Sequence, residues 1–208
     1  MKSAFATLLL VLAATPLFAQ ERRATLTVWA SQVSYEGENE LVPDFSTEFD
    51  DGNALGASVN FFMTRHFSVE ASVFGIRSDA RLIFEDAAEL DLGKIDLVPI
   101  TLGAQFHILG QSRFDPYVGA GGAYVMADDL NSRDLDVLGL GRIQLENELT
   151  YYLNAGVGVQ ITDAFGIVVD GRMIPYETSS TSTSPTRPGS EDLDFSPRIL
   201  SVGLRFRF

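Results

Sequence analysis

Residues 149–162 read LTYYLNAGVGVQIT, and apolar residues occupy every second position of this segment without a break. One face carries only apolar side chains, at Leu149, Tyr151, Leu153, Ala155, Val157, Val159 and Ile161. A period of two is that of a β-strand. Strands of globular proteins have about five or six residues, whereas a tilted strand that crosses a bilayer needs about nine to eleven. The pattern therefore predicts a strand of membrane-crossing length.

Seven further segments show the same period, with varying clarity. They are residues 24–36, 54–64, 67–77, 95–108, 116–126, 165–176 and 200–208. The total is eight, an even number as single-chain outer-membrane barrels have. Residues 116–126 hold so much glycine and alanine that the pattern does not assign their faces. Alternation alone fits either a soluble β-sandwich or a membrane barrel, since both have one apolar face.

The connections between these segments alternate in length along the chain. Short ones lie at 64–66, 109–115 and 162–164, and long ones at 37–53, 78–94, 127–148 and 177–194. Outer-membrane barrels have short periplasmic turns and long extracellular loops, whereas a Greek-key sandwich has no reason to sort its loops by end. We expect an all-β, eight-stranded, antiparallel up-and-down transmembrane β-barrel. The Ser/Thr-rich run 178–186 is expected to be a mobile loop.

Charged residues near the middle of strands decide which face meets lipid. Glu70, Asp170 and Arg172 lie about halfway along their segments. A basic residue that faces lipid at mid-depth costs roughly 2–4 kcal/mol, so we expect these side chains to point inward. By the same alternation, Gln105 and Arg205 also lie on the inward face of their segments. Because eight strands enclose a lumen that side chains can fill, we expect Glu70, Gln105, Asp170, Arg172 and Arg205 to form a polar plug of compensating charges. A selective pore or proton-linked gate is the alternative.

The first nineteen residues differ from the rest of the chain. Lys2 precedes an apolar run at 4–14, and Ala19 ends the segment. The run is too short to span a bilayer as a helix, so residues 1–19 read as a signal peptide and residues 20–208 as one barrel domain. Cleavage removes Lys2 and changes the formal charge from −13 to −14. Nothing in so acidic a chain favours nucleic acid as a partner.

Three stretches resemble one family of outer-membrane proteins. Residues 95–107 read IDLVPITLGAQFH, residues 114–121 read FDPYVGAG, and residues 203–208 read GLRFRF. The first two resemble neighbouring strands of OmpW-like barrels, although similar strings occur in other eight-stranded families, including OmpA-like and adhesin-like ones. The last is similar to the terminal signal read by the barrel-assembly machinery, which implies that role for Gly203, Leu204, Phe206 and Phe208. The resemblance also implies localisation in the cell outer membrane.

Two functions follow from this resemblance. OmpW-like proteins are associated with passage of small hydrophobic molecules through an apolar path in the upper barrel wall. Trp29, Phe62 and Tyr152 are predicted to face inward and would line such a path if they lie above the plug. The alternative is a structural or adhesin-like surface barrel with a filled lumen and no transport activity. A cavity of several hundred Å³ that opens outward would favour transport.

Nothing in the sequence indicates an enzyme or a cofactor site. The two histidines, His66 and His107, are expected at the periplasmic end, away from lipids that arrive at the outer rim. No G-x-S-x-G motif or metal-ligand spacing appears, and there is no cysteine. The acidic stretch 36–51 is expected to be a solvated loop rather than a cation site. The expected partners are outer-membrane lipid and lipopolysaccharide, the assembly machinery, periplasmic chaperones and a small hydrophobic ligand.

Overall fold

A computed structural model describes residues 23–36, 39–42, 45–49, 51–84, 89–110, 112–127, 143–145, 147–182, 190–194 and 196–208. The predicted signal peptide lies outside these residues. Within the described ranges, no helix is long and apolar enough to cross a membrane.

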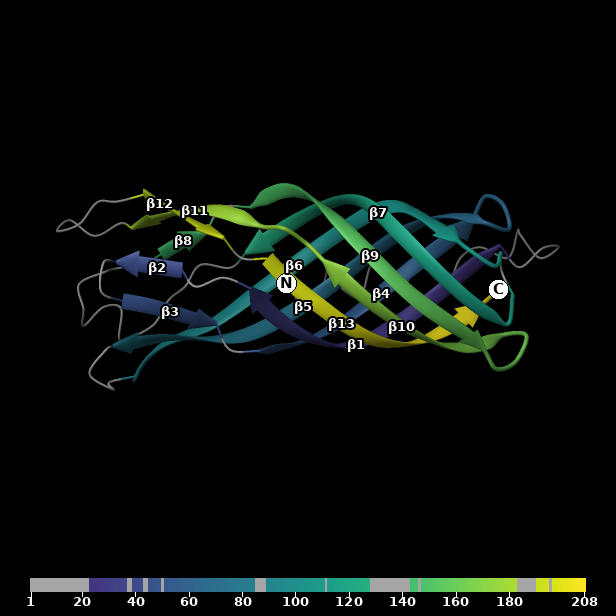
Figure 1. Cartoon of the computed structure of the whole chain (residues 1–208), viewed down its shortest axis with the longest axis horizontal. Coiled ribbons are helices and arrows are strands. Elements are labelled where there is room, and N and C mark those ends of the chain that lie inside the picture. The colour runs from purple at the N-terminus through teal and green to yellow at the C-terminus, as the bar shows by residue number, and fades with distance from the viewer. Residues whose placement is uncertain are drawn as a thin grey trace, which may run out of the picture.

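Eight strands form a closed antiparallel barrel, as predicted (Figure 1). They are β1 (Ala24–Glu36), β4 (Gly52–Phe62), β5 (Phe67–Phe84), β6 (Glu89–His107), β7 (Phe114–Ala127), β9 (Glu148–Gln160), β10 (Phe165–Met173) and β13 (Ser196–Arg207). Each pairs with its neighbours along the chain, and β1 pairs with β13 to close the wall. Tight turns connect β4 to β5 and β9 to β10 at the end where the C-terminus lies.

Strand structure extends further at the opposite end than the sequence pattern predicted. The hairpin of β2 (Asn39–Val42) and β3 (Phe45–Phe49) adds to the far part of β5, with Thr47 opposite Leu82. A separate small sheet joins β8 (Ile143–Leu145), β11 (Glu177–Ser182) and β12 (Ser190–Asp194). The prediction of loops at 37–53, 78–94, 127–148 and 177–194 was therefore wrong in part, and β11 occupies the start of the predicted mobile run 178–186. Backbone groups pair in these extensions without needing an apolar face, so hydrophobic alternation does not reveal them.

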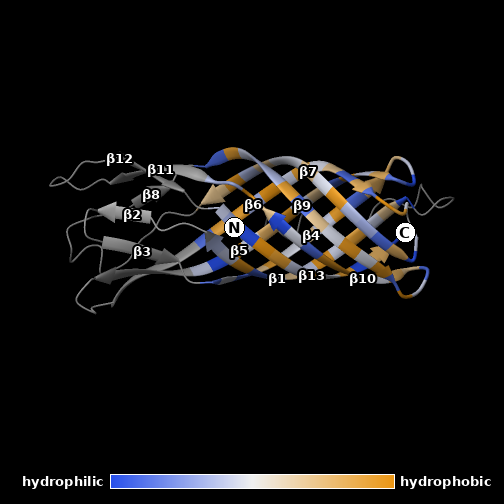
Figure 2. Cartoon of the chain, in the orientation of Figure 1, coloured by the Kyte–Doolittle hydropathy of each residue, from blue (hydrophilic) through white to orange (hydrophobic). Residues whose placement is uncertain are grey.

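The barrel wall has an apolar outer face. Figure 2 shows hydrophobic positions alternating with polar ones along the strands. Lipid-facing Leu55, Leu102 and Leu200 are each more than half exposed. Near the end with the short turns, outward phenylalanines form what we call the phenylalanine belt: Phe61, Phe67, Phe106, Phe114, Phe165, Phe206 and Phe208. Aromatic girdles of this kind mark the level of the membrane interface.

Inward glycines let large side chains lie flat against the inner wall. A Cβ on Gly203 would come within 2.5 Å of the Trp29 ring, and one on Gly103 within 2.5 Å of the Tyr152 hydroxyl. Real Cβ atoms do not approach other atoms so closely. The interior therefore combines bulky residues on some strands with glycine opposite them, which is how a narrow barrel is filled.

Candidate functional site

The centre of the lumen is organised around Arg172 of β10. Its guanidinium pairs with Glu70 of β5 and donates to Ser72 Oγ at 2.7 Å and Thr101 Oγ1 at 3.0 Å. The same group lies over the rings of Phe74 and Tyr152, with Cζ to centroid distances of 5.2 and 4.7 Å. Charge pairing, hydrogen bonds and cation–π contacts together compensate the burial of this cation.

Two further side chains complete the surroundings of Glu70. Gln105 Nε2 donates to Glu70 Oε2 at 2.9 Å, and Asn60 in turn donates to the Gln105 carbonyl oxygen. Glu70 and Gln105 are each 1% exposed. Side chains from three other strands thus surround one buried carboxylate, and its contacts run across the barrel rather than along one strand.

Asp170 is the second buried carboxylate at this level. Its Oδ2 accepts hydrogen bonds from Tyr117 and from Asn154 Nδ2, both at 2.8 Å. Its Oδ1 lies 3.6 Å from Arg172 Nε, which is an ion-pair distance but too long for a direct hydrogen bond. Asp170 therefore shares the charge of Arg172 with Glu70.

A third group lies nearer the short turns. Ser68 Oγ and His107 Nε2 are 3.0 Å apart, His107 Nδ1 lies 2.9 Å from Asp115 Oδ1, and Arg205 donates to Asp115 Oδ2 at 3.1 Å. The first two contacts follow the order of a Ser–His–Asp triad. All three side chains are at most 2% exposed, and Asp115 also holds Arg205. In this structure the group therefore fills the barrel and presents no open nucleophile.

The structure places the five residues predicted for the polar plug inside the lumen, all buried. It brings Glu70, Gln105, Asp170 and Arg172 into one network, while Arg205 belongs to the group around Asp115. Their role as a barrier remains a prediction. Sequence reasoning missed Ser68, His107 and Asp115 as partners. The available signal was the inward facing of Ser68 and His107 at the periplasmic ends of neighbouring strands, whereas Asp115 lay in the predicted connection 109–115.

The lumen beyond this network, toward the long connections, is apolar. Val33, Ile76, Leu97, Val125 and Ile199 are each at most 3% exposed and belong to one packed cluster. Ile174 and Tyr176 from the segment after β10 join them. Tyr35 packs against the cluster, and its hydroxyl lies 2.7 Å from Ser78 Oγ. We call this region the apolar upper lumen.

The three aromatic residues predicted to line an apolar path all point inward and are at most 2% exposed. Trp29 Nε1 donates to Ser58 Oγ at 2.9 Å, and Tyr152 lies beside Arg172 at the level of the charges. Phe62 contacts His107, with ring centroids 4.8 Å apart, at the periplasmic end. Phe62 therefore lies on the periplasmic side of the charged network. The sequence pattern could not predict this, because it indicates which face a side chain is on but not how deep it lies in the barrel.

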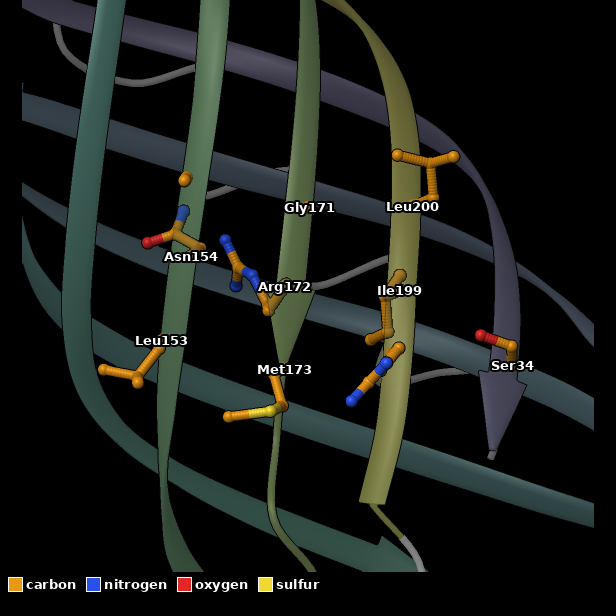
Figure 3. A pocket seen from close by; sticks show the side chains of 10 residues that line it. Ser34, Leu153, Asn154, Gly171, Arg172, Met173, Ile199 and Leu200 are labelled. Carbon is orange, nitrogen blue, oxygen red and sulfur yellow. The ribbon is translucent and has the colours of Figure 1, made fainter. Parts of the chain in front are cut away.

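A groove of about 420 Å³ opens on the lipid-facing wall over β9, β10 and β13 (Figure 3). Its lining includes Leu153, Ala155, Gly171, Met173 and Leu200, together with Ser34 and the exposed Arg198. Buried Asn154, Arg172 and Ile199 also contribute to the lining. The groove therefore lies against the part of the wall that carries Arg172 and the start of the apolar upper lumen.

The β9–β10 ladder has a gap beside this groove, which we call the wall interruption, and pairing resumes between β8 and β11 with Leu145 opposite Ser180. Leu153 opposite Met173 is the last described pair between β9 and β10, whereas β9 continues along β7 as far as Glu148. Residues 174–176 leave the ladder, and Ile174 N donates to Pro197 O of β13 at 3.2 Å. Among the described residues, this part of β9 has a ladder partner on one side only.

No group of three or more His, Cys, Asp or Glu residues is positioned to hold a metal ion in the described part of the chain. Glu70, Asp115 and Asp170 are instead engaged with Arg172, Arg205 and neutral donors. The contacts that the structure shows are those of a filled polar interior.

A closed barrel of eight tilted strands, with an apolar outer face, a charged network inside and an aromatic belt at one end, defines a bacterial outer-membrane β-barrel protein. The family model for the OmpW family matches residues 16–208, so the chain belongs to that family. It is similar to the outer membrane protein AlkL of Ectopseudomonas oleovorans, at 22% identity over 171 residues that cover 80% of this chain and 71% of AlkL.

Solved structures agree with this fold. The crystal structure of OprG from Pseudomonas aeruginosa superposes with a TM-score of 0.74 at 16% identity, covering 89% of this chain and 96% of OprG. The solid-state NMR structure of AlkL in lipid bilayers gives a TM-score of 0.65 at 20% identity, covering 89% and 90%. At such identities these structures show the fold, and the protein is placed in the outer membrane by its relatives.

Proposed function

We propose that this protein passes small hydrophobic molecules from the cell exterior into the outer membrane through the side wall of its barrel. The observation that carries the proposal is the position of the wall interruption. It lies where the apolar upper lumen meets the charged network around Arg172. The association of OmpW-like proteins with passage of small hydrophobic molecules supports the same function.

The direction of passage follows from the contents of the lumen. An apolar molecule that enters from the extracellular end meets apolar side chains and exchanges one apolar contact for another. Further descent would bring it against Glu70, Asp170 and Arg172, whose hydrogen bonds and ion pairs it cannot replace. The route with the lowest free-energy cost therefore leads sideways, between β9 and the segment 174–176, toward the groove at Gly171.

The groove has the size and chemistry of an exit for such a molecule. Its volume of about 420 Å³ falls in the range of small-molecule sites. Leu153, Ala155 and Leu200 border it on the lipid side. A molecule leaving the lumen here would move directly into the acyl chains of the bilayer.

The test uses vesicles with lipopolysaccharide in the outer leaflet, because this leaflet is the barrier to apolar solutes. Entry of a fluorescent apolar probe should be faster with the protein than in empty vesicles. Gly171→Trp fills the groove and should return entry to nearly the empty-vesicle rate. Gly122→Trp is the matched control, since both glycines face outward with no atom nearer than 3.9 Å to an added Cβ.

The outcomes distinguish this function from its alternative. No difference between wild-type and empty vesicles would support a structural or adhesin-like barrel with a filled lumen. An equal loss of entry in both tryptophan variants would show that the groove at Gly171 is not the exit.

A further inference from the structure

The charged side chains at the periplasmic end are unlike those of the rest of the molecule. The chain carries a formal charge of −13, yet the exposed charged side chains at the described short-turn end are Arg23, Arg65, Arg113 and Asp163. Three cations against one anion give this end a local excess of positive charge. We call Arg23, Arg65 and Arg113 the arginine rim.

Each residue of the rim lies directly beyond the phenylalanine belt. Arg113 precedes Phe114, and Arg65 lies in the turn between Phe61 and Phe67. The carbonyl of Arg23 accepts a hydrogen bond from Phe62 N at 2.7 Å, which fixes the backbone at the start of β1. The belt marks the apolar boundary of the membrane, so the rim lies one step outside it, at the depth of lipid headgroups.

Two residues of the rim, Arg65 and Arg113, lie on short connections rather than on long loops. Arg113 Nε donates to Gln160 O at 3.2 Å, which ties this side chain to the neighbouring strand β9. In the β4–β5 turn, Thr64 Oγ1 accepts from the backbone N–H groups of His66 at 3.2 Å and Phe67 at 3.0 Å. The turn that carries Arg65 is thereby held in one shape.

We propose that the arginine rim binds the phosphate groups of anionic phospholipids in the inner leaflet of the outer membrane. Guanidinium and phosphate match in charge and in bidentate hydrogen-bond geometry. Arginines at the surface of an anionic membrane add affinity for each residue that reaches it. The belt supplies the acyl-chain contacts and the rim supplies the headgroup contacts of the same lipid.

The test is native mass spectrometry of the folded mature protein with phosphatidylglycerol or with phosphatidylcholine of identical chains. The wild type should retain phosphatidylglycerol preferentially. The variant R65Q/R113Q should lose this preference, by roughly fivefold in affinity for each arginine removed. Arg77→Gln is the matched control, because Arg77 is an exposed arginine on β5 at the far end, paired with Asp96 at 2.8 Å.

Three results would overturn the proposal. They are equal retention of the two lipids by the wild type, an unchanged preference in R65Q/R113Q, or an equal loss per charge in Arg77→Gln. The last would indicate a general effect of net charge. Each variant is first shown to be folded by electrophoresis, in which the unboiled sample should migrate differently from the boiled one. If the double variant does not fold, the single variants R65Q and R113Q are tested instead. Lipid retention is measured independently of transport, so the lipid-binding proposal can be refuted without refuting the proposed function.

Discussion

Arg172 is the side chain on which the interior of the barrel depends most. It is 3% exposed and faces two carboxylates, Glu70 and Asp170, together with two hydroxyls and two aromatic rings. Removing one partner of a buried ion pair leaves the other charge uncompensated, which costs more than the pair itself contributes. Arg172 should therefore be the most sensitive charged position in the lumen.

Arg172→Met should lower the free energy of unfolding by about 3 kcal/mol, because Glu70 and Asp170 then remain buried without their cation. Urea titration of the protein in lipid vesicles, followed by electrophoresis without boiling, measures this change. The double variant Glu70→Gln/Arg172→Met should recover part of the loss. Arg77→Gln, at an exposed pair, should leave the midpoint unchanged. If Arg172→Met were as stable as the wild type, the network would not have the structural role given to it.

Trp29 offers a direct optical view of the packed interior, since it is the single tryptophan of the chain. Gly203→Ala would bring a Cβ to 2.5 Å from its ring and should displace it. We expect a shifted emission spectrum and a loss of about 1–3 kcal/mol of stability, typical of overpacking. Gly122→Ala is the control and should change neither. An unshifted spectrum in Gly203→Ala would contradict the close seating of Trp29 over Gly203.

For single residues, the inward or outward orientation of the side chain was predictable from the sequence, whereas its contacts across the lumen were not. Alternation indicated that Glu70, Gln105, Asp170, Arg172 and Arg205 point inward. It could not indicate that Glu70 and Arg172, which lie 102 positions apart, would meet across the lumen. The depth of Phe62 and the contacts of His107 with Ser68 and Asp115 depend on how far neighbouring strands are staggered, and a single strand does not carry that information.

At the scale of strands, outward facing is enforced by lipid. Along β10, Ile167 and Val169 face outward while Val168 and Asp170 are buried, so a shift of one residue would expose a carboxylate to the bilayer. The same alternation holds along β13, where Leu200, Val202 and Leu204 face outward. The position of each strand relative to the membrane is thus set by its apolar outer row.

Val169→Lys tests this row. A lysine facing lipid near mid-depth should cost roughly 2–4 kcal/mol of folding free energy, and less near an interface. Gln32→Lys is the comparison, because Gln32 faces outward beyond the apolar row of β1 and should tolerate the charge. Urea titrations of both variants in vesicles give the two costs. Equal costs would mean that residue 169 does not lie deeper in the membrane than residue 32.

The eight strands of the wall were predictable from the sequence because lipid imposes a strict alternation on them. The extensions β2, β3, β8, β11 and β12 were not, because hydrophobic alternation does not mark them. The early end of β10 at Met173 was also missed, since the pattern continued to Tyr176. Tyr176 still points inward and is buried, so facing persists where ladder pairing stops.

For the whole molecule, the lumen has two levels that do different things. The periplasmic half holds the paired charged and polar side chains around Arg172 and Asp115, although Asp170 Oδ1 and Arg172 Nε have no hydrogen-bond partner among the described residues. The extracellular half is filled mainly by apolar side chains. Eight strands leave no room for a wide aqueous channel. The wall interruption at the junction of the two levels is what relates this arrangement to the proposed passage of hydrophobic molecules.

We propose that apolar molecules, and not water-soluble ones, pass this barrel. The most direct measurement compares entry of an apolar probe and of a hydrophilic solute of similar size into the same lipopolysaccharide-coated vesicles. The proposed function predicts that the protein accelerates entry of the apolar probe and leaves the hydrophilic solute at the rate of empty vesicles. Acceleration of both solutes to the same degree would reveal an aqueous path through the charged network and contradict the claim.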